Sequence, residues 1–231
     1  MTFAIVLVFT VAACFALRNP LRAWPWAFYV LAFAFDVVFF AGVSGWLPRA
    51  AWSAMLVLMQ KCMLPLALFA VVMYLGVLPS DVRPSLWLKP VRAELSVIAW
   101  ILSLGHVVVY AATYLPRIVV GGPVDANVGA SFVVAVVLLA LLMVLGATSF
   151  NVVKKRMNAA FWKKVQRLAY PFFLLVYVHV LLMLLPSALR GGIASGVSVA
   201  VYSVMFLAYF ILRIVRARGE RRARRSEEAA G

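Results

Sequence analysis

Long apolar stretches dominate this sequence, and they constrain its fold more than any other feature. The hydrocarbon core of a bilayer is about 30 Å thick, and a helix needs about 20 mostly apolar residues to cross it. Stretches that meet or approach this length lie at about residues 2–17, 24–44, 54–78, 95–115, 128–150, 167–187 and 195–215. Alternation with a period of two is absent, so helices are indicated and a membrane barrel is not. The sequence therefore predicts an all-α integral membrane protein with about seven transmembrane helices.

The charge of the chain is one-sided. Of 231 residues, 66% are hydrophobic and 13% are charged, and 22 Lys and Arg against 7 Asp and Glu give a net charge of +15. When alternate loops are assigned to opposite sides, 18 basic residues lie on one side, Arg49, Arg117 and Arg190 lie on the other, and Lys61 falls within a span. The positive-inside rule then places the N-terminus outside and the C-terminus in the cytoplasm. The positive-inside rule thus accounts for the net positive charge of the chain, so nucleic acid is not an expected partner.

The two ends of the chain raise separate questions. The first apolar stretch is short and resembles the core of a secretory signal, but Arg18 and Arg22 follow it and no basic residue precedes it, which favours a retained helix. At the other end, the basic run from Arg213 to Arg225 is expected to be disordered beyond its first turns. Its expected role is to lock the topology and to contact anionic lipid, at about 1 kcal/mol per basic residue.

Ionisable side chains at membrane depth are costly and are candidates for function. Asp36 in the second span and Lys61 in the third fall at similar mid-membrane depths. They are interpreted first as a buried ion pair that holds two helices together, because an unpaired charge would cost several kcal/mol. Proton movement, quinone binding and the binding of an acidic cofactor group are the alternatives.

The chain has two histidines, and they fall at one depth. His106 follows Arg92 by 14 residues, and His179 follows Arg167 by 12. At about 1.5 Å per residue, both imidazoles lie roughly 18 to 21 Å from the cytoplasmic edge. Two such histidines on two helices have the geometry of axial ligation of a b-type haem, and Gly105 beside His106 would leave room for the macrocycle. Hydrogen bonds between helices are the alternative role.

Two blocks of the sequence resemble a known family. The first is Arg92-Ala-Glu-Leu-Ser followed by Leu104-Gly-His-Val-Val-Val-Tyr110. The second comprises Thr148-Ser149, Lys154-Lys-Arg-Met157, Trp162-Lys-Lys-Val-Gln166, Tyr170 and His179. Together these blocks resemble the ferric reductase-like transmembrane domain, and most closely its bacterial haem-binding membrane subunit of the methionine sulfoxide reductase system (MsrQ). The resemblance covers about residues 88–215.

The resemblance implies a haem site and a departure from the family pattern. Family members carry b-haem ligands on the fourth and sixth spans, and some stack two haems with ligands about thirteen or fourteen residues apart. The corresponding positions here are Arg92 and Gln166, which are not haem ligands. One haem b is therefore expected, held by His106 and His179 in the outer half of the membrane. Lys61 is the expected partner of its propionates, since Arg117 and Arg190 each lie 11 residues, about 16 Å, beyond the histidine of their helix.

The expected domains are residues 1–87 as three N-terminal transmembrane helices, 88–215 as the haem-binding core, and 216–231 as a basic cytoplasmic tail. The leading function is electron transfer from a quinol or a cytosolic flavoprotein to an extracytoplasmic reductase or acceptor, in a bacterial inner membrane. No Gly-rich nucleotide loop occurs, so the chain is expected to be a subunit of an oxidoreductase, with quinone and FMN left open as further cofactors. The alternative is a haem-free seven-helix transport or scaffold protein with Asp36 and Lys61 as its polar site. Cys14 and Cys62 are expected to be buried and unpaired.

Overall fold

The computed structural model describes residues 2–230, with the side chains of Gln60, Ala223, Arg224 and 227–230 left out. All regular elements in these residues are helices, which confirms the all-α class. They are α1 (Thr2–Ala16), α2 (Arg18–Ala23), α3 (Pro25–Val43), α4 (Arg49–Met55), the π-helix η1 (Leu56–Gln60), α5 (Met63–Leu75), α6 (Arg83–Leu88), the 3₁₀-helix η2 (Lys89–Val91), α7 (Arg92–Val119), α8 (Ala126–Ser149), α9 (Asn151–Arg156), α10 (Ala159–Gln166), α11 (Ala169–Leu189) and α12 (Ile193–Ala230).

Six helical segments in the described chain are long and apolar enough to cross a membrane. They are Pro25–Val43, Arg49–Leu75, Arg83–Val119, Ala126–Ser149, Ala159–Leu189 and Ile193–Arg222. The expected seventh span, α1, has 15 residues and is about 22 Å long at the rise of an α-helix, less than the thickness of a bilayer core. The chain leaves α1 at Leu17 and begins the short helix α2 at once, which limits its length. The protein is therefore a multi-pass membrane protein with six full-length candidate spans.

The third span is broken in its middle, where a continuous helix was expected. The π-helix η1 follows α4, Lys61 and Cys62 interrupt the helix, and Cys62 has a left-handed backbone with φ of 52°. Pro65 accounts for the position of the break, because proline has no N–H for the carbonyl four residues earlier, which belongs to Lys61, and its ring crowds that carbonyl. Lys61 thus lies at an interruption between two half-helices.

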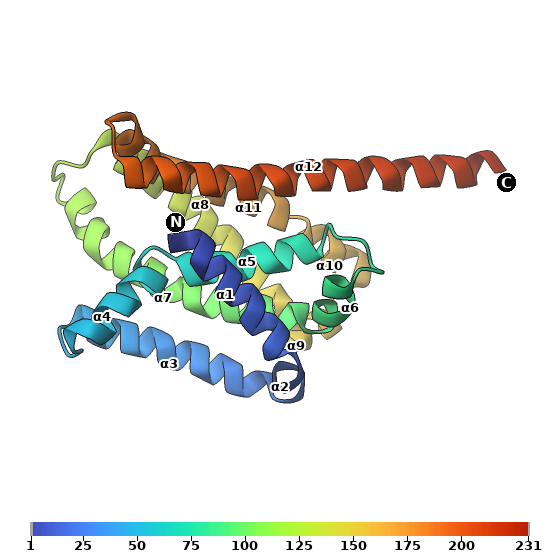
Figure 1. Cartoon of the computed structure of the whole chain (residues 1–231), viewed down its shortest axis with the longest axis horizontal. Coiled ribbons are helices and arrows are strands. Elements are labelled where there is room, and N and C mark those ends of the chain that lie inside the picture. The colour runs from blue at the N-terminus through green and yellow to red at the C-terminus, as the bar shows by residue number, and fades with distance from the viewer. Residues whose placement is uncertain (1, 231) are drawn as a thin grey trace.

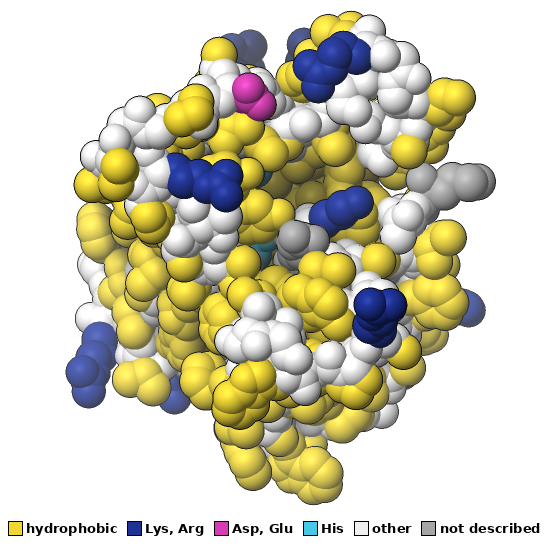
Figure 2. Space-filling view, turned by 90° about the vertical axis from the view of Figure 1, so that its left-hand side faces the viewer, with side chains coloured by type: hydrophobic (Ala, Val, Ile, Leu, Met, Phe, Trp, Pro, Cys, Tyr) yellow, Lys and Arg dark blue, Asp and Glu magenta, His cyan; other side chains and the backbone are white. Residues whose placement is uncertain are grey.

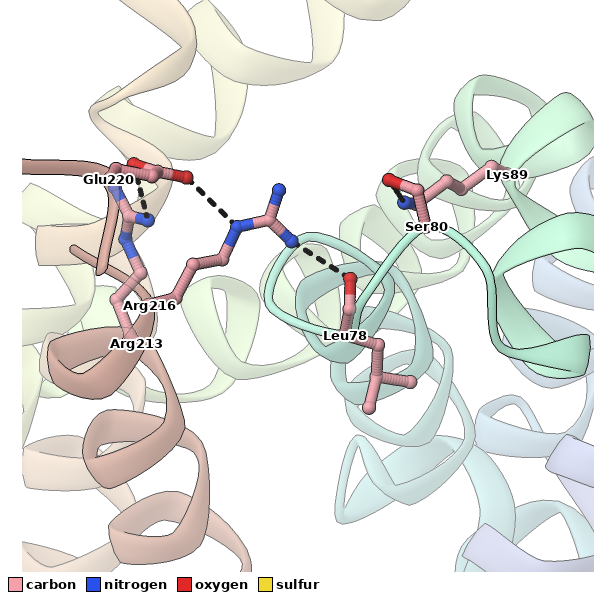
Figure 3. A network of polar contacts seen from close by, with 6 residues as sticks. All are labelled: Leu78, Ser80, Lys89, Arg213, Arg216 and Glu220. Atoms are coloured by element: carbon pink, nitrogen blue, oxygen red, sulfur yellow. Dashed lines mark hydrogen bonds and ion pairs between the residues drawn. The ribbon is translucent and has the colours of Figure 1, made fainter. Parts of the chain in front are cut away.

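The basic tail is helical, so the expectation of disorder beyond its first turns is wrong. Helix α12 continues to Ala230 and projects beyond the rest of the molecule (Figure 1). At the point where it leaves the bundle, Arg216 pairs with Glu220 at 2.9 Å across one helical turn and donates a hydrogen bond from Nη1 to the carbonyl of Leu78 at 2.8 Å (Figure 3). Arg213 lies 3.9 Å from the same carboxylate. The hydrogen bond to Leu78 fastens the base of the projecting helix to the end of the third span, and Glu220 pairs with both arginines within α12.

The helices run roughly along the long axis of the molecule, and α5 is central among them (Figure 1). One apolar core joins α5 to α1, α3 and α7, and a second joins α5 to α1, α11 and α12. Helix α8 packs against both α7 and α11. The loops at 44–48, 120–125 and 190–192 lie at one end of the bundle, called here the loop end, whereas α2, α6, α9 and α10 lie at the other, called here the basic end (Figure 1).

Candidate functional site

His179 lies in the middle of α11, ten residues from each end of that helix, and faces α8. Its Nδ1 atom is 2.9 Å from the hydroxyl oxygen of Ser131 and 3.2 Å from the carbonyl oxygen of the same residue. A carbonyl has no hydrogen to donate, so the second contact is a hydrogen bond only when Nδ1 carries the proton. In a neutral imidazole the other nitrogen is then an acceptor. When Nδ1 carries the proton, it donates toward Ser131, which is 2% exposed, and the lone pair of Nε2 is then available.

His106 lies near the middle of α7, 14 residues after Arg92 and 13 before Val119, and is half-buried. Its ring lies against Tyr110 one turn further along, with a centroid separation of 4.6 Å. The helix that carries His106 and the helix that carries His179 are connected through α8, which packs against both. Both histidines thus lie near the middle of their helices and on either side of one shared neighbour.

The space beside Gly105 is filled by Asp36, so the expected room for a macrocycle at that face is absent. A Cβ atom at Gly105 would collide with the Asp36 carboxylate, which shows that the missing side chain lets α3 approach α7. Asp36 is 5% exposed, and its Oδ1 atom has no hydrogen-bond partner among the described residues. A macrocycle that approaches His106 must therefore use another face of α7.

The expected ion pair between Asp36 and Lys61 is not formed in the described chain. Lys61 is exposed, whereas Asp36 is buried against α7. The break at Lys61 explains the error, because depth was counted along a continuous helix that does not exist here. Seen from the loop end, the surface is hollowed between the helices, and a histidine side chain is visible on the floor of the hollow with a Lys or Arg side chain close by (Figure 2).

The two positions where relatives would carry a second ligand pair are engaged in contacts within the protein. Gln166 donates a hydrogen bond from Nε2 to the hydroxyl of Thr148 at 2.9 Å. Arg92 donates from Nε to the carbonyl of Val72, in α5, at 3.0 Å. Each side chain therefore connects neighbouring segments near the basic end.

Sequence reasoning missed Ser131 as a neighbour of His179, and it included Tyr110 in the block around His106 without giving it a role. Ser131 is one of few polar residues in an apolar stretch, which is a usable signal, but its distance from His179 depends on how α8 packs on α11. Tyr110 follows His106 by four residues, a spacing that places two side chains on one helix face.

Cys14 is buried and Cys62 half-buried, and both are free. Within residues 2–230, no group of three or more His, Cys, Asp or Glu side chains is placed to hold a metal ion.

These features define a helical multi-pass membrane protein with two histidines at the middle of two helices that both pack against α8. The family model described as ferric reductase like transmembrane component matches residues 56–177, more than half of the chain, and the chain belongs to this family. Membership indicates membrane electron transfer, and domains of this family generally bind haem. The match includes His106 and Gln166 and ends two residues before His179.

One relative is an uncharacterized protein of Treponema pallidum (strain Nichols), which is 47% identical over 133 residues. The aligned region comprises 57% of this chain and 37% of the relative, so the chain spans little more than a third of that protein. No solved structure matches the chain.

Proposed function

We propose that the chain is a membrane electron carrier that holds one b-type haem between His106 and His179. The observation that carries this proposal is the pair of contacts between Ser131 and Nδ1 of His179, because the tautomer in which Nδ1 donates to the Ser131 carbonyl has on Nε2 the lone pair that an axial ligand needs. Histidines that bind metals almost always donate their other N–H to a carbonyl, carboxylate or water. The remaining four ligands of a haem iron come from the porphyrin, so two protein side chains suffice.

The haem supplies the one-electron chemistry, and the chain supplies its binding site. Imidazole nitrogens of His106 and His179 would bind the iron, and Ser131 would fix the orientation of the second ring. The apolar side chains of α5, α7, α8 and α11 exclude water and lower the local dielectric, which is one of the means by which proteins tune a haem potential. Lys61, exposed at the break in the third span, would be the cation for the propionates.

A single haem accounts best for the positions of Arg92 and Gln166. Neither side chain is a normal haem ligand, and both are hydrogen-bonded within the protein. A route of electrons through two stacked haems is therefore not part of this proposal.

The proposed setting is the inner membrane of a bacterium, with the N-terminus outside and the C-terminus in the cytoplasm. Eighteen basic residues belong to the segments that the sequence assigns to the cytoplasm, which supports this orientation. A quinol or a cytosolic flavoprotein would donate electrons, and an extracytoplasmic reductase or acceptor would receive them, as in the methionine sulfoxide reductase system. The chain would act as the haem subunit of such an oxidoreductase.

An absorption spectrum of the detergent-purified protein before and after dithionite tests the proposal. We expect a Soret band and sharp bands in the reduced state, both lost in His106→Ala and in His179→Ala. Gln166→Ala is the matched control and should leave the spectrum unchanged, because Gln166 bonds to Thr148. Colourless, folded protein from haem-supplied cells would overturn the proposal and favour a haem-free transport or scaffold protein with Asp36 and Lys61 as its polar site.

A further inference from the structure

An aromatic stack on α7 leads from His106 toward the loop end. The His106 and Tyr110 rings are 4.6 Å apart, and the Tyr110 and Tyr114 rings are 6.0 Å apart with an angle of 7° between their planes. The guanidinium of Arg117 lies 5.9 Å from the centre of the Tyr114 ring. The residues are spaced by four, four and three positions, so one face of one helix carries all four side chains.

The stack ends at a cavity. Tyr114 and Arg117 line a space of about 170 Å³ together with Pro123, Val124, Asp125 and Val128, between the end of α7 and the start of α8. The Tyr114 position is eight residues beyond His106, about 12 Å along the helix axis. A group bound in the cavity would therefore be linked to the imidazole by two rings instead of by aliphatic side chains alone.

The charge at this end of the molecule favours an anion. Arg49, Arg117 and Arg190 belong to the loop end, and Asp125 is the acidic residue of the loop that borders the cavity. In the described part of the chain, Arg117 forms no ion pair with a carboxylate. Its charge is thus available to a ligand beside Tyr114.

We infer that Tyr110 and Tyr114 are the electron exit route, and that the cavity beside Arg117 receives an anionic one-electron acceptor. This inference rests on the proposed haem site. A reduced haem held by His106 would supply one electron and be oxidised by one unit, and the acceptor would take up that electron with no proton transferred. The tyrosine rings are not oxidised; they shorten the gap across which the electron tunnels.

Stopped-flow reoxidation of the dithionite-reduced haem protein by ferricyanide, an anionic acceptor, tests the route. We expect Tyr110→Leu/Tyr114→Leu to slow reoxidation by about an order of magnitude, with the haem spectrum and midpoint potential unchanged. The double Phe variant keeps both rings and should react at the original rate. Tyr170→Leu, at the opposite end of the bundle, is the control and should also react normally.

Equal reoxidation rates for the double Leu variant and the original protein would overturn the route, as would an equal slowing in the double Phe variant. If Tyr110→Leu prevents haem binding, the reoxidation rate of the single variant Tyr114→Leu tests the route, because Tyr114 is a further turn from His106.

The cavity is tested with Arg117→Gln. This variant should slow the reaction with ferricyanide and leave the reaction with the cationic acceptor hexaammineruthenium(III) unchanged. No effect on either rate would overturn the assignment of the cavity. If the original protein binds no haem, the proposed function is contradicted. If it binds haem but the tyrosine variants react at the original rate, only the route is contradicted.

Discussion

At the scale of the single residue, the polar side chains within the spans act through one or two close contacts. Ser131 holds His179 through two contacts to one nitrogen. Asp36 occupies the space that Gly105 leaves open, and its carboxylate meets backbone instead of a cation. The residue types could be read from the sequence, but their partners could not, because a partner depends on how two helices are rotated against each other.

Replacement of Ser131 tests whether the hydroxyl positions the ligand. We expect Ser131→Ala to weaken haem binding about tenfold, the lower end of the usual loss for a group that orients a metal ligand, because the carbonyl contact to Nδ1 remains. The measurement is haem titration of the apoprotein, together with the midpoint potential, which should also shift. Ser131→Thr keeps the hydroxyl and should restore both values.

Ser198→Ala is the matched control for this experiment, because Ser198 is half-buried on α12 and donates a hydrogen bond to the carbonyl of Ala194 in its own helix. Unchanged affinity and potential in Ser131→Ala would show that the hydroxyl is a passive neighbour of the ring.

At the scale of the helix, close approach depends on glycine at particular positions. A Cβ atom at Gly146 in α8 would collide with the indole ring of Trp100 in α7. Gly129, in the same helix, has no atom within 4 Å of the place where a Cβ would lie. The sequence shows both glycines within one apolar stretch and does not distinguish them, because the difference arises from the face of α8 that meets α7.

These two glycines allow one substitution to be compared at two positions of one helix. We expect Gly146→Ala to destabilise the protein by about 1–3 kcal/mol, since the added methyl overpacks the contact with Trp100. Gly129→Ala should be neutral or slightly stabilising, because alanine favours a helix over glycine by about 1 kcal/mol. Unfolding in detergent, followed by circular dichroism, measures both. Equal stability of the two variants would contradict the packing of α7 on α8 described here.

For the third span, the sequence predicted the membrane crossing correctly but not the interruption of the helix. Its apolar stretch predicted a crossing of the membrane, and Arg49–Leu75 has the length and hydropathy for one. The break at Lys61 and Cys62 was missed although Pro65 is visible in the sequence. Proline in a transmembrane helix is often tolerated, so the residue alone does not determine whether the helix kinks or stops.

At the scale of the whole molecule, the fold gathers loops that are far apart in the sequence at two ends. The loops at 44–48, 120–125 and 190–192 lie at one end, and α12 projects from the other (Figure 1). Arg216 in α12 bonds to the carbonyl of Leu78 at the end of the third span, so the projecting helix is tied to the bundle where it leaves it.

The orientation of this bundle in the membrane can be tested with fused reporters. We expect green fluorescent protein fused after Gly231 to fluoresce and alkaline phosphatase at the same position to be inactive, because the positive-inside rule predicts that the basic end lies in the cytoplasm. A fusion of alkaline phosphatase after Gly122, in the loop between α7 and α8, should be active. The reverse pattern at both positions would show that the bundle has the opposite orientation.

The sequence by itself determined that this chain folds in a bilayer, that it is helical, and approximately where six of its candidate spans lie, because a bilayer imposes a minimum length and apolarity on each helix. It also singled out His106 and His179, since a chain with two histidines leaves few candidate ligands. Only the tertiary structure decided where the third span is interrupted, that Lys61 and Asp36 do not pair, and that Ser131 lies against His179. These facts depend on where helices stop and how their faces meet, which are products of packing among side chains remote in sequence and not of the local apolar pattern.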